Sequence, residues 1–209
     1  MSEPLEATSS ATPRILLIAC GALAHEIVAL KNLHQWQHLD VQCLPADLHN
    51  RPQKIAPAVR AQIVAHRDRY QHMYVVYADC GTGGELDRVL AEERVERISG
   101  AHCYQFYAGA QAFAQLHDEE PGTFYLTDFL LRHFERLVIR ALGLDRHPQL
   151  RDQYFGHYQR LVFLAQLPPD DGTLAQARAA ADRLGLTLEV RHTGYGELES
   201  SLKAVVWHH

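Results

Sequence analysis

The chain has 209 residues, of which 47% are hydrophobic and 22% are charged, and its formal net charge is −5 at pH 7. This size and composition are typical of a globular protein with a substantial hydrophobic core, built as one domain. The mild negative charge provides no electrostatic basis for binding nucleic acid or an anionic membrane surface, so we expect neither as a partner.

The N-terminal residues and the cysteine content bear on the cellular compartment. Residues 1–12 are rich in Ser, Thr, Glu and Pro and predict a disordered arm, because no basic segment is followed by an apolar run as in a signal peptide. No apolar run reaches the roughly 18 residues that cross a bilayer. A chain with four cysteines and no export signal is not expected to form a disulfide framework. We therefore expect a cytoplasmic protein.

Apolar runs alternate along the chain with stretches that carry apolar residues at helical spacing. Strands are expected at 14–20, 41–45, 72–80, 95–100, 123–126, 161–166 and 187–192. Helices are expected at 22–33, 52–66, 85–94, 106–116, 128–142, 147–157, 173–184 and 198–206. This alternation predicts an α/β fold with a doubly wound, mainly parallel, Rossmann-like sheet and helices on both faces. Residues 13–207 are expected to form a single domain, with 128–158 as a small helical insertion or lid.

Three of the four cysteines lie where a predicted strand ends: Cys20, Cys80 and Cys103. In a doubly wound sheet the carboxyl ends of parallel strands share one edge, which is where such folds bind ligands. Neighbouring strands are about 4.8 Å apart, and thiolates on one tetrahedral zinc ion are about 3.8 Å apart. These positions predict a site for zinc or an iron–sulfur cluster. His49 and His102 come from loops at the same edge and are candidate ligands beside the cysteines.

A different explanation is that these cysteines pack in the core, since free cysteine is among the most buried residue types. We assign that role to Cys43, which lies inside the second predicted strand.

The glycine-rich turn after the third predicted strand reads Gly81-Thr82-Gly83-Gly84. Turn amides and a helix N-terminus favour anions, so Gly81, Gly83 and Gly84 are candidates for contact with a cofactor. The turn matches neither the dinucleotide-binding nor the P-loop pattern, and Glu85 and Asp87 put negative charge where a phosphate would lie. The glycines are better explained by a backbone that curls around whatever the preceding cysteine contacts.

Three further side chains are candidates for acid–base catalysis at this edge. His25 and Glu26 open the helix that follows Cys20, and Asp79 directly precedes Cys80. Each has a titratable group suited to proton transfer or to supporting a metal ligand. Glu26 is equally well explained by the helix dipole, which favours an acid in the first turn.

The combination I-A-C-G near residue 18, L-P-A-x-L-H-N, Y-x-D-C-G-T-G-G-x-L-D and G-x-H-C-Y resembles the DUF1638 family, from about Ile15 to Leu202. That family has no assigned activity. The resemblance implies a stand-alone domain that accompanies corrinoid-dependent methyl transfer, with a small molecule or a corrinoid-type component as partner. Such a context suits a thiolate metal site, because zinc-bound thiolates activate methyl acceptors.

Three functions compete at this point. The first is a zinc or iron–sulfur protein, with or without a role in one-carbon metabolism. The second is a cofactor-independent enzyme that uses a cysteine nucleophile, with His102 or His25 as base. The third is a module that binds a small ligand or a corrinoid-type partner without turnover, in which the cysteines only pack.

Overall fold

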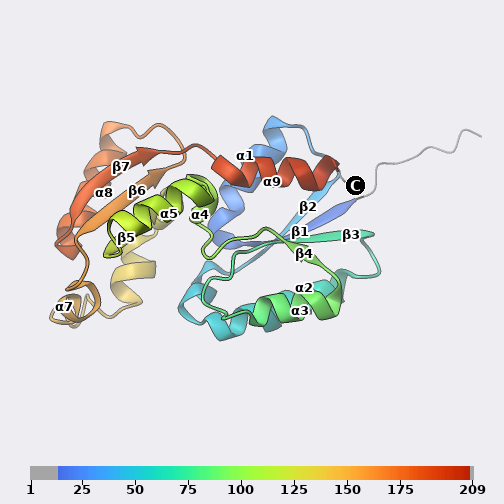
Figure 1. The fold of residues 1–209 in the computed structure, drawn as a ribbon, viewed down its shortest axis with the longest axis horizontal. Coiled ribbons are helices and arrows are strands. Elements are labelled where there is room, and N and C mark those ends of the chain that lie inside the picture. The colour runs from blue at the N-terminus through green and yellow to red at the C-terminus, as the bar shows by residue number, and fades with distance from the viewer. Residues whose placement is uncertain (1–13, 208–209) are drawn as a thin grey trace, which may run out of the picture.

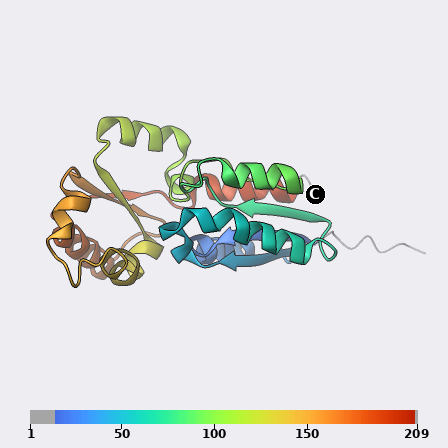
Figure 2. The same cartoon turned by 90° about the horizontal axis from the view of Figure 1, so that it is seen from below.

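The computed structural model describes residues 14–207 and has two parallel sheets lying side by side along the long axis of the molecule (Figures 1 and 2). The predicted N-terminal arm, residues 1–12, lies outside the described residues. The predicted α/β class with parallel strands and helices is confirmed. The strands divide into a sheet of four and a sheet of three. That 13–207 behaves as one domain stays a prediction.

The first sheet has the strand order β2-β1-β3-β4. Its strands are β1 (Ile15–Cys20), β2 (Leu39–Leu44), β3 (His72–Val76) and β4 (Glu96–Arg97). From the central strand β1 the chain first pairs β2 on one side and then β3 on the other, with Ala19 opposite Cys43 and Val76. The strand order therefore reverses between β1 and β3, which creates a crevice beyond their carboxyl ends.

Helices cover both faces of this sheet (Figure 1). They are α1 (Ala24–Leu33) and α9 (Gly196–Trp207) on one face and α2 (Ile55–His66) and α3 (Glu85–Glu93) on the other. The continuous apolar sequence of β1 reflects this sandwich, because each of its six residues is buried. α9 comes from the far end of the chain, and its buried Leu198, Leu202 and Val205 belong to the core of the first sheet.

The second sheet has the order β5-β6-β7, formed by β5 (Thr123–Thr127), β6 (Arg160–Ala165) and β7 (Thr187–His192). Alternate residues of β6 face opposite sides. Leu161 and Phe163 pack with α8 (Asp171–Leu184), whereas Val162 and Leu164 pack with Leu116 of α5 (Ala110–Glu119). Each face of this sheet is therefore covered by its own helices.

The remaining segments are short, and of them only α4 lies on the connection from the first sheet to the second. They are the short turns η1 (Gly21–Leu23), η2 (Ala46–Asn50) and η3 (Pro52–Lys54), the helices α4 (Gln105–Ala108), α6 (Asp128–Arg132) and α7 (Leu150–Phe155), and a π-helical turn, η4 (Glu135–Arg140). Sequence periodicity predicted one helix over 128–142, but α6 ends at Arg132 and η4 follows. The segment 128–158 is helical as predicted, and whether it acts as a lid stays a prediction.

The start of α9 is held against α4 by a close backbone approach. A Cβ atom on Gly196 would lie 2.2 Å from the carbonyl oxygen of Tyr107 and 2.6 Å from that of Phe106. Gly196 also has φ +50°, a region that favours glycine. Glu197 accepts a hydrogen bond of 2.9 Å from the amide of Ala110 at the start of α5. α9 is thereby attached to the loop that connects the two sheets.

Among residues 14–207, no helix combines the length and the apolar character needed to cross a membrane.

Candidate metal centre

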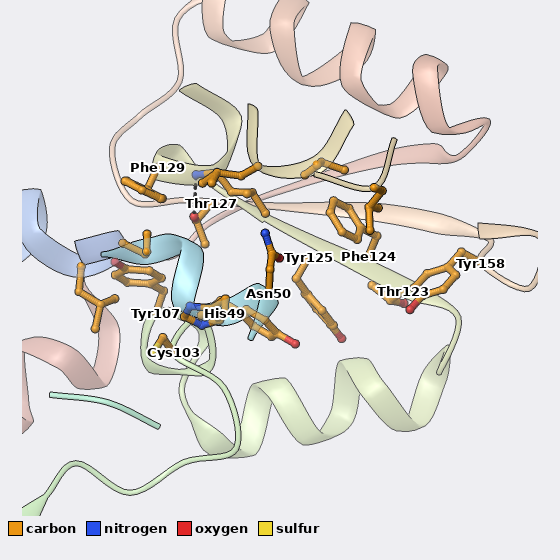
Figure 3. A pocket seen from close by; sticks show the side chains of 18 residues that line it. His49, Asn50, Cys103, Tyr107, Thr123, Phe124, Tyr125, Thr127, Phe129 and Tyr158 are labelled. Atoms are coloured by element: carbon orange, nitrogen blue, oxygen red, sulfur yellow. Dashed lines mark hydrogen bonds between the residues drawn. The ribbon is translucent and has the colours of Figure 1, made fainter. Parts of the chain in front are cut away.

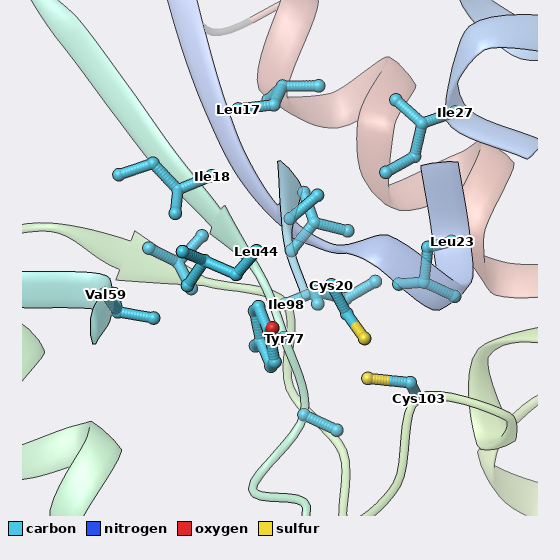
Figure 4. Close-up of a cluster of buried hydrophobic side chains, with 14 of the residues drawn as sticks. Leu17, Ile18, Cys20, Leu23, Ile27, Leu44, Val59, Tyr77, Ile98 and Cys103 are labelled. Atoms are coloured by element: carbon cyan, nitrogen blue, oxygen red, sulfur yellow. The ribbon is translucent and has the colours of Figure 1, made fainter. Parts of the chain in front are cut away.

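Three of the predicted ligands meet at the carboxyl edge of the first sheet. Cys20 ends β1, His49 lies in η2 directly after β2, and Cys103 lies in the loop between β4 and α4. One ligand atom from each of these residues lies within 4.8 Å of the other two. The Sγ atom of Cys20 is 3.7 Å from Nδ1 of His49, and Figure 4 shows the sulfurs of Cys20 and Cys103 pointing toward one another.

The fourth residue at this edge, Cys80, approaches from the loop after β3. Its Sγ atom lies 3.3 Å from that of Cys103, although Cys80 does not belong to the group whose ligand atoms all lie within 4.8 Å of one another. Cys80 has φ +49°, a left-handed conformation that is strained for a residue with a side chain. Backbone strain of this kind is commonly found at functional sites. The amide of Cys80 donates to the carbonyl oxygen of Ala101 at 2.8 Å, which ties the Cys80 loop to the Cys103 loop.

The glycine-rich turn is organised around Asp79. Its carboxylate accepts hydrogen bonds from the hydroxyl of Thr82 at 2.6 Å and from the amides of Gly81, Gly83 and Gly84 at 3.0–3.3 Å. The hydrogen bond from Thr82, followed by those from the amides, lowers the pKa of Asp79 despite the opposing effect of desolvation. The three glycine amides that were candidates for cofactor contact are therefore engaged within the turn, and Asp79 holds the backbone that positions Cys80.

The titratable groups of the cluster shift one another's pKa values in opposite directions. The interaction with the Cys103 thiol, assisted by His49 and opposed by burial, lowers the pKa of Cys20 to about 5, and the same causes lower that of Cys80 to about 5. Burial acts to lower the pKa of His49, but the thiolates of Cys20 and Cys80 outweigh it and raise that pKa to about 10. The neighbouring thiolates and burial raise the pKa of Cys103. These shifts favour the thiolate forms of Cys20 and Cys80, which are the forms that ligate a metal. The raised pKa of His49 favours its protonated form, so His49 would release a proton when a metal binds.

Two buried tyrosines lie beside the sulfurs. Tyr77 is fully buried, its hydroxyl has no hydrogen-bond partner among the described residues, and burial together with the charge of Cys20 raises its pKa. Figure 4 shows this hydroxyl next to Cys20 and Cys103. Tyr107 is also buried with a hydroxyl that lacks a partner in the described part of the chain. Sequence reasoning missed Tyr77, for which the available signal was a polar group within an otherwise apolar run, whereas Tyr107 was among the aromatic residues considered as a possible pocket lining.

The cluster borders a cavity of about 370 Å³ between the two sheets. Figure 3 shows His49, Cys103 and Tyr107 together at one end of this cavity, with Thr127 and Tyr125 of β5 forming another wall. We call it the aromatic cavity, since its lining includes Tyr104, Tyr107, Phe124, Tyr125, Phe129 and Tyr158. Among the described residues, no Asp, Glu, Lys or Arg lines it. The cavity therefore suits an uncharged, largely apolar ligand.

Other predicted residues lie outside the group of ligand atoms. His102 stacks on Tyr104, with ring centroids 4.9 Å apart, and burial lowers its pKa. His25 and Glu26 line a separate cavity on another side of α1. Cys43 is half-buried and packs against the first core, as predicted for a core residue. The structure thus brings together Cys20, His49 and Cys103, with Cys80 against Cys103, and leaves His102 to the side.

Comparison with known proteins places the chain in a family without giving it an activity. No curated protein matches the sequence. The sequence profile of the family described as "Protein of unknown function (DUF1638)" matches residues 43–202 and thus covers the loops that carry His49, Cys80 and Cys103. On this match, which extends over more than half of the chain, the protein belongs to the DUF1638 family.

Proposed function

We propose that this protein binds a single soft metal ion, zinc, through Cys20, His49 and Cys103, and presents it to a ligand in the aromatic cavity. The observation that carries the proposal is the mutual spacing of the three ligand atoms, all within 4.8 Å. Thiolates on one tetrahedral zinc ion are about 3.8 Å apart, and mixed sulfur and nitrogen sets are typical of zinc. An iron–sulfur cluster takes thiolates on separate iron atoms, so it would need the sulfurs further apart than they are here.

Three protein ligands leave one position of a tetrahedral ion free, as in catalytic zinc sites. Cys80 is the protein group closest to taking that position, because its sulfur is 3.3 Å from that of Cys103. His49 and Cys103 both line the aromatic cavity, so a ligand held there competes with Cys80 for the ion. We infer that Cys80 is an exchangeable fourth ligand that closes the site in the resting protein.

Transfer of a methyl or other one-carbon group is the reaction class that we propose for this ion. Zinc bound by thiolates polarises or deprotonates the group that occupies its open position, which favours attack by that group on a methyl or acyl donor. Support comes from the position of His49 and Cys103 on a cavity whose lining, among residues 14–207, has no Asp, Glu, Lys or Arg, and from the resemblance that suggests a corrinoid-type partner. The aromatic lining would select the apolar part of the acceptor.

Metal analysis of freshly purified, anaerobically handled protein tests the metal site. We expect one zinc per chain, and a loss of stoichiometric binding in Cys20→Ser, Cys103→Ser and His49→Gln. Cys43→Ser is the matched control, since Cys43 is a half-buried cysteine of the neighbouring strand that lies outside the ligand group. Cys80→Ser distinguishes an exchangeable ligand from a permanent one. If Cys80 is exchangeable, this variant is expected to bind one zinc per chain with weaker affinity.

Two results would contradict the proposal. One is a metal-free wild-type protein that does not take up zinc on titration. The other is a Cys43→Ser variant that loses as much metal as Cys103→Ser, since that would mean the losses reflect general disruption of the fold.

The low pKa of Cys80, about 5, favours a second candidate function, an enzyme with a cysteine nucleophile. The imidazole that contacts a thiol in this arrangement is that of His49. This function predicts that, in metal-free protein, iodoacetamide labels Cys80 much faster than Cys43 and that His49→Gln removes the difference. Zinc at one equivalent protects Cys80 if the metal site is correct, and leaves its labelling unchanged if the thiol acts alone.

A further inference from the structure

A second cavity, which we call the polar cavity, lies at the carboxyl end of the second sheet and does not include the sulfur cluster. It has a volume of about 430 Å³. Its walls come from α1, α6, the loop between β6 and α8, the start of α8, and Tyr195 just before α9. Ligands of parallel α/β folds bind beyond the carboxyl ends of the strands and at the boundaries between structural units, and this cavity satisfies both conditions.

A buried carboxylic acid forms part of the wall. Glu26 is only 4% exposed, and its Oε2 atom has no hydrogen-bond partner among residues 14–207. Burying a carboxyl group without a partner is unfavourable, and the loss of hydration raises the pKa of Glu26. The neighbouring Tyr107 hydroxyl offsets this cost only in part, and a molecule bound in the polar cavity would supply the missing partner. The dipole of α1, which explained this residue from the sequence, does not account for its burial.

A second carboxylate in the same wall is held rigidly. The Oδ2 atom of Asp128 accepts hydrogen bonds from the backbone amides of Gln166 at 3.0 Å and Leu167 at 3.1 Å. The side chain of Gln166, itself buried, returns a bond by accepting from the amide of Asp128 at 2.9 Å. This reciprocal arrangement fixes the carboxylate before any ligand arrives, which is the preorganisation that binding sites require.

Two basic side chains complete the lining. Arg132, one turn after Asp128, donates from Nε to the carbonyl oxygen of Asp128 at 3.2 Å, and its terminal nitrogens have no ion-pair partner in the described chain. His25 lines the cavity beside Glu26. The Arg132 guanidinium and the His25 imidazole both interact electrostatically with the carboxyl group of Glu26, so acids and bases lie near one another around a single space.

We propose that the polar cavity binds a zwitterion of the α-amino acid class, with its ammonium group against Glu26 and Asp128 and its carboxylate against Arg132 and His25. The four side chains do not form a metal site, because the Cys20, His49 and Cys103 set is the one group in residues 14–207 whose ligand atoms converge closely enough. The lining also holds a third acid, Asp170, whose Oδ1 accepts a hydrogen bond of 2.7 Å from the amide of Thr173. A purely anionic ligand would face three carboxyl groups, and a purely cationic one would face the guanidinium. Opposite charges on one small molecule match the lining.

The polar cavity is also close to the metal centre. Glu26 lines the polar cavity and interacts electrostatically with Tyr107, which lines the aromatic cavity. These two buried side chains therefore link the linings of the two cavities. The amino acid site stands on its own observations and does not require the metal proposal to be correct.

The test is thermal denaturation of the full chain with each standard α-amino acid, followed by calorimetric titration of any that stabilise it. Ethanolamine and propionate serve as probes that carry only the ammonium or only the carboxylate group. We expect at least one amino acid to raise Tm with increasing concentration, and neither single-charge probe to do so. Losing one charge-assisted contact in Glu26→Gln or Arg132→Gln is expected to weaken binding roughly 10- to 100-fold.

Arg136→Gln is the matched control, because Arg136 is an exposed arginine one turn further on that does not line the polar cavity. It is expected to bind like the wild type. Arg132 is exposed, so its variant is expected to fold even if Glu26→Gln does not. The proposal is overturned if no amino acid raises Tm, if ethanolamine or propionate binds as tightly, or if Arg132→Gln and Arg136→Gln bind alike.

Discussion

The two sheets share parallel strands and helical cover on both faces but differ in what their carboxyl ends carry. The first sheet reverses its strand order between β1 and β3, and the cysteines gather beyond that point. The second sheet runs β5-β6-β7 in chain order, without a reversal. It contributes Tyr125 and Thr127 as cavity wall and Asp128 as an anchored carboxylate.

The candidate ligands therefore come from one sheet and most of the facing cavity wall from the other. Cys20 ends a strand of the first sheet and His49 and Cys103 lie in loops after its strands, whereas the wall facing them comes largely from β5 and the helical segment after it. The aromatic cavity exists because the two sheets lie against each other. Variants that loosen one sheet can therefore show how far the other depends on it.

The largest effect is expected from Phe163→Ala in the core of the second sheet. Phe163 is fully buried, and truncating such a side chain costs about 3–5 kcal/mol of unfolding free energy. Trp36, 8% exposed in the first core, reports on the other sheet by fluorescence. If residues 13–207 unfold as one unit, the fluorescence midpoint falls together with that of far-ultraviolet circular dichroism.

An unchanged Trp36 midpoint beside a shifted dichroism curve would show two independent folding units. Val190→Ala, in β7 of the same sheet but 38% exposed, is the control and is expected to change little.

Gly196→Ala, at the connection between the sheets, is expected to lower the free energy of unfolding by about 2–4 kcal/mol. The loss is the sum of overpacking and of backbone strain in the left-handed region. The added methyl group would collide with the carbonyl oxygen of Tyr107. Gly194→Ala is a matched control, because Gly194 also has positive φ, +61°, but open space around its Cβ position. The difference in unfolding free energy between the two variants, measured by denaturant titration, gives the cost of the collision alone. Equal destabilisation would mean that α9 does not pack closely enough on α4 to exclude a methyl group.

A smaller effect, about 1–2 kcal/mol, is expected from Asp79→Ala, which removes the acceptor that organises the glycine-rich turn. Because the turn positions Cys80, zinc affinity is expected to fall with stability in this variant. Asp118→Ala changes an exposed acid on α5 and is expected to alter neither property. Chemical denaturation and competitive zinc titration measure the two effects. Normal zinc affinity in Asp79→Ala would contradict the proposal that Cys80 is a zinc ligand.

The smallest expected effect is a change in the pH at which the thiols beyond the first sheet titrate. In metal-free protein the thiolate absorbance in the ultraviolet is expected to persist down to pH near 5, the lowered pKa of Cys20 and Cys80. Because a lowered pKa means that the proton binds only at lower pH, the signal is lost on acidification below that value. His49→Gln removes one of the causes and is expected to shift the midpoint partway toward the ordinary cysteine pKa near 9. An unchanged midpoint in this variant would show that His49 does not lower the pKa of the thiols.

The local sequence pattern was sufficient to identify the candidate metal ligands along the chain. Cys20 follows an apolar run, and Cys80 and the Cys103 loop follow two more, so their position at one edge could be inferred from parallel strands alone. Whether the sulfurs meet depends on strand order, and strand order is decided by which hydrophobic faces pack together. β1 pairs with β3, and both contribute to a core shared with helices distant in sequence, which no residue within either strand specifies.

The division into two sheets was not predictable for the same reason. β4 and β5 look like consecutive members of one sheet in the sequence, yet β4 pairs with β3 alone and β5 begins a separate sheet. Predicting that the hydroxyl of Tyr77 lies beside the sulfurs would have required knowing which turn of the chain approaches them. Buried polar groups acquire their role from partners distant in sequence, and amphipathic periodicity does not encode those partners.

The return of α9 to the first sheet has a consequence for synthesis. Leu198, Leu202 and Val205 complete a face of the core that begins with β1, so that core stays open until residues 196–207 have left the ribosome. The loop with Cys103 packs through α4 against the same helix. Cys20 and His49 are synthesised long before the last part of their support. A metal ion that arrives before α9 has packed would therefore meet an incomplete ligand group, so binding of the proposed ion is expected only once α9 is in place.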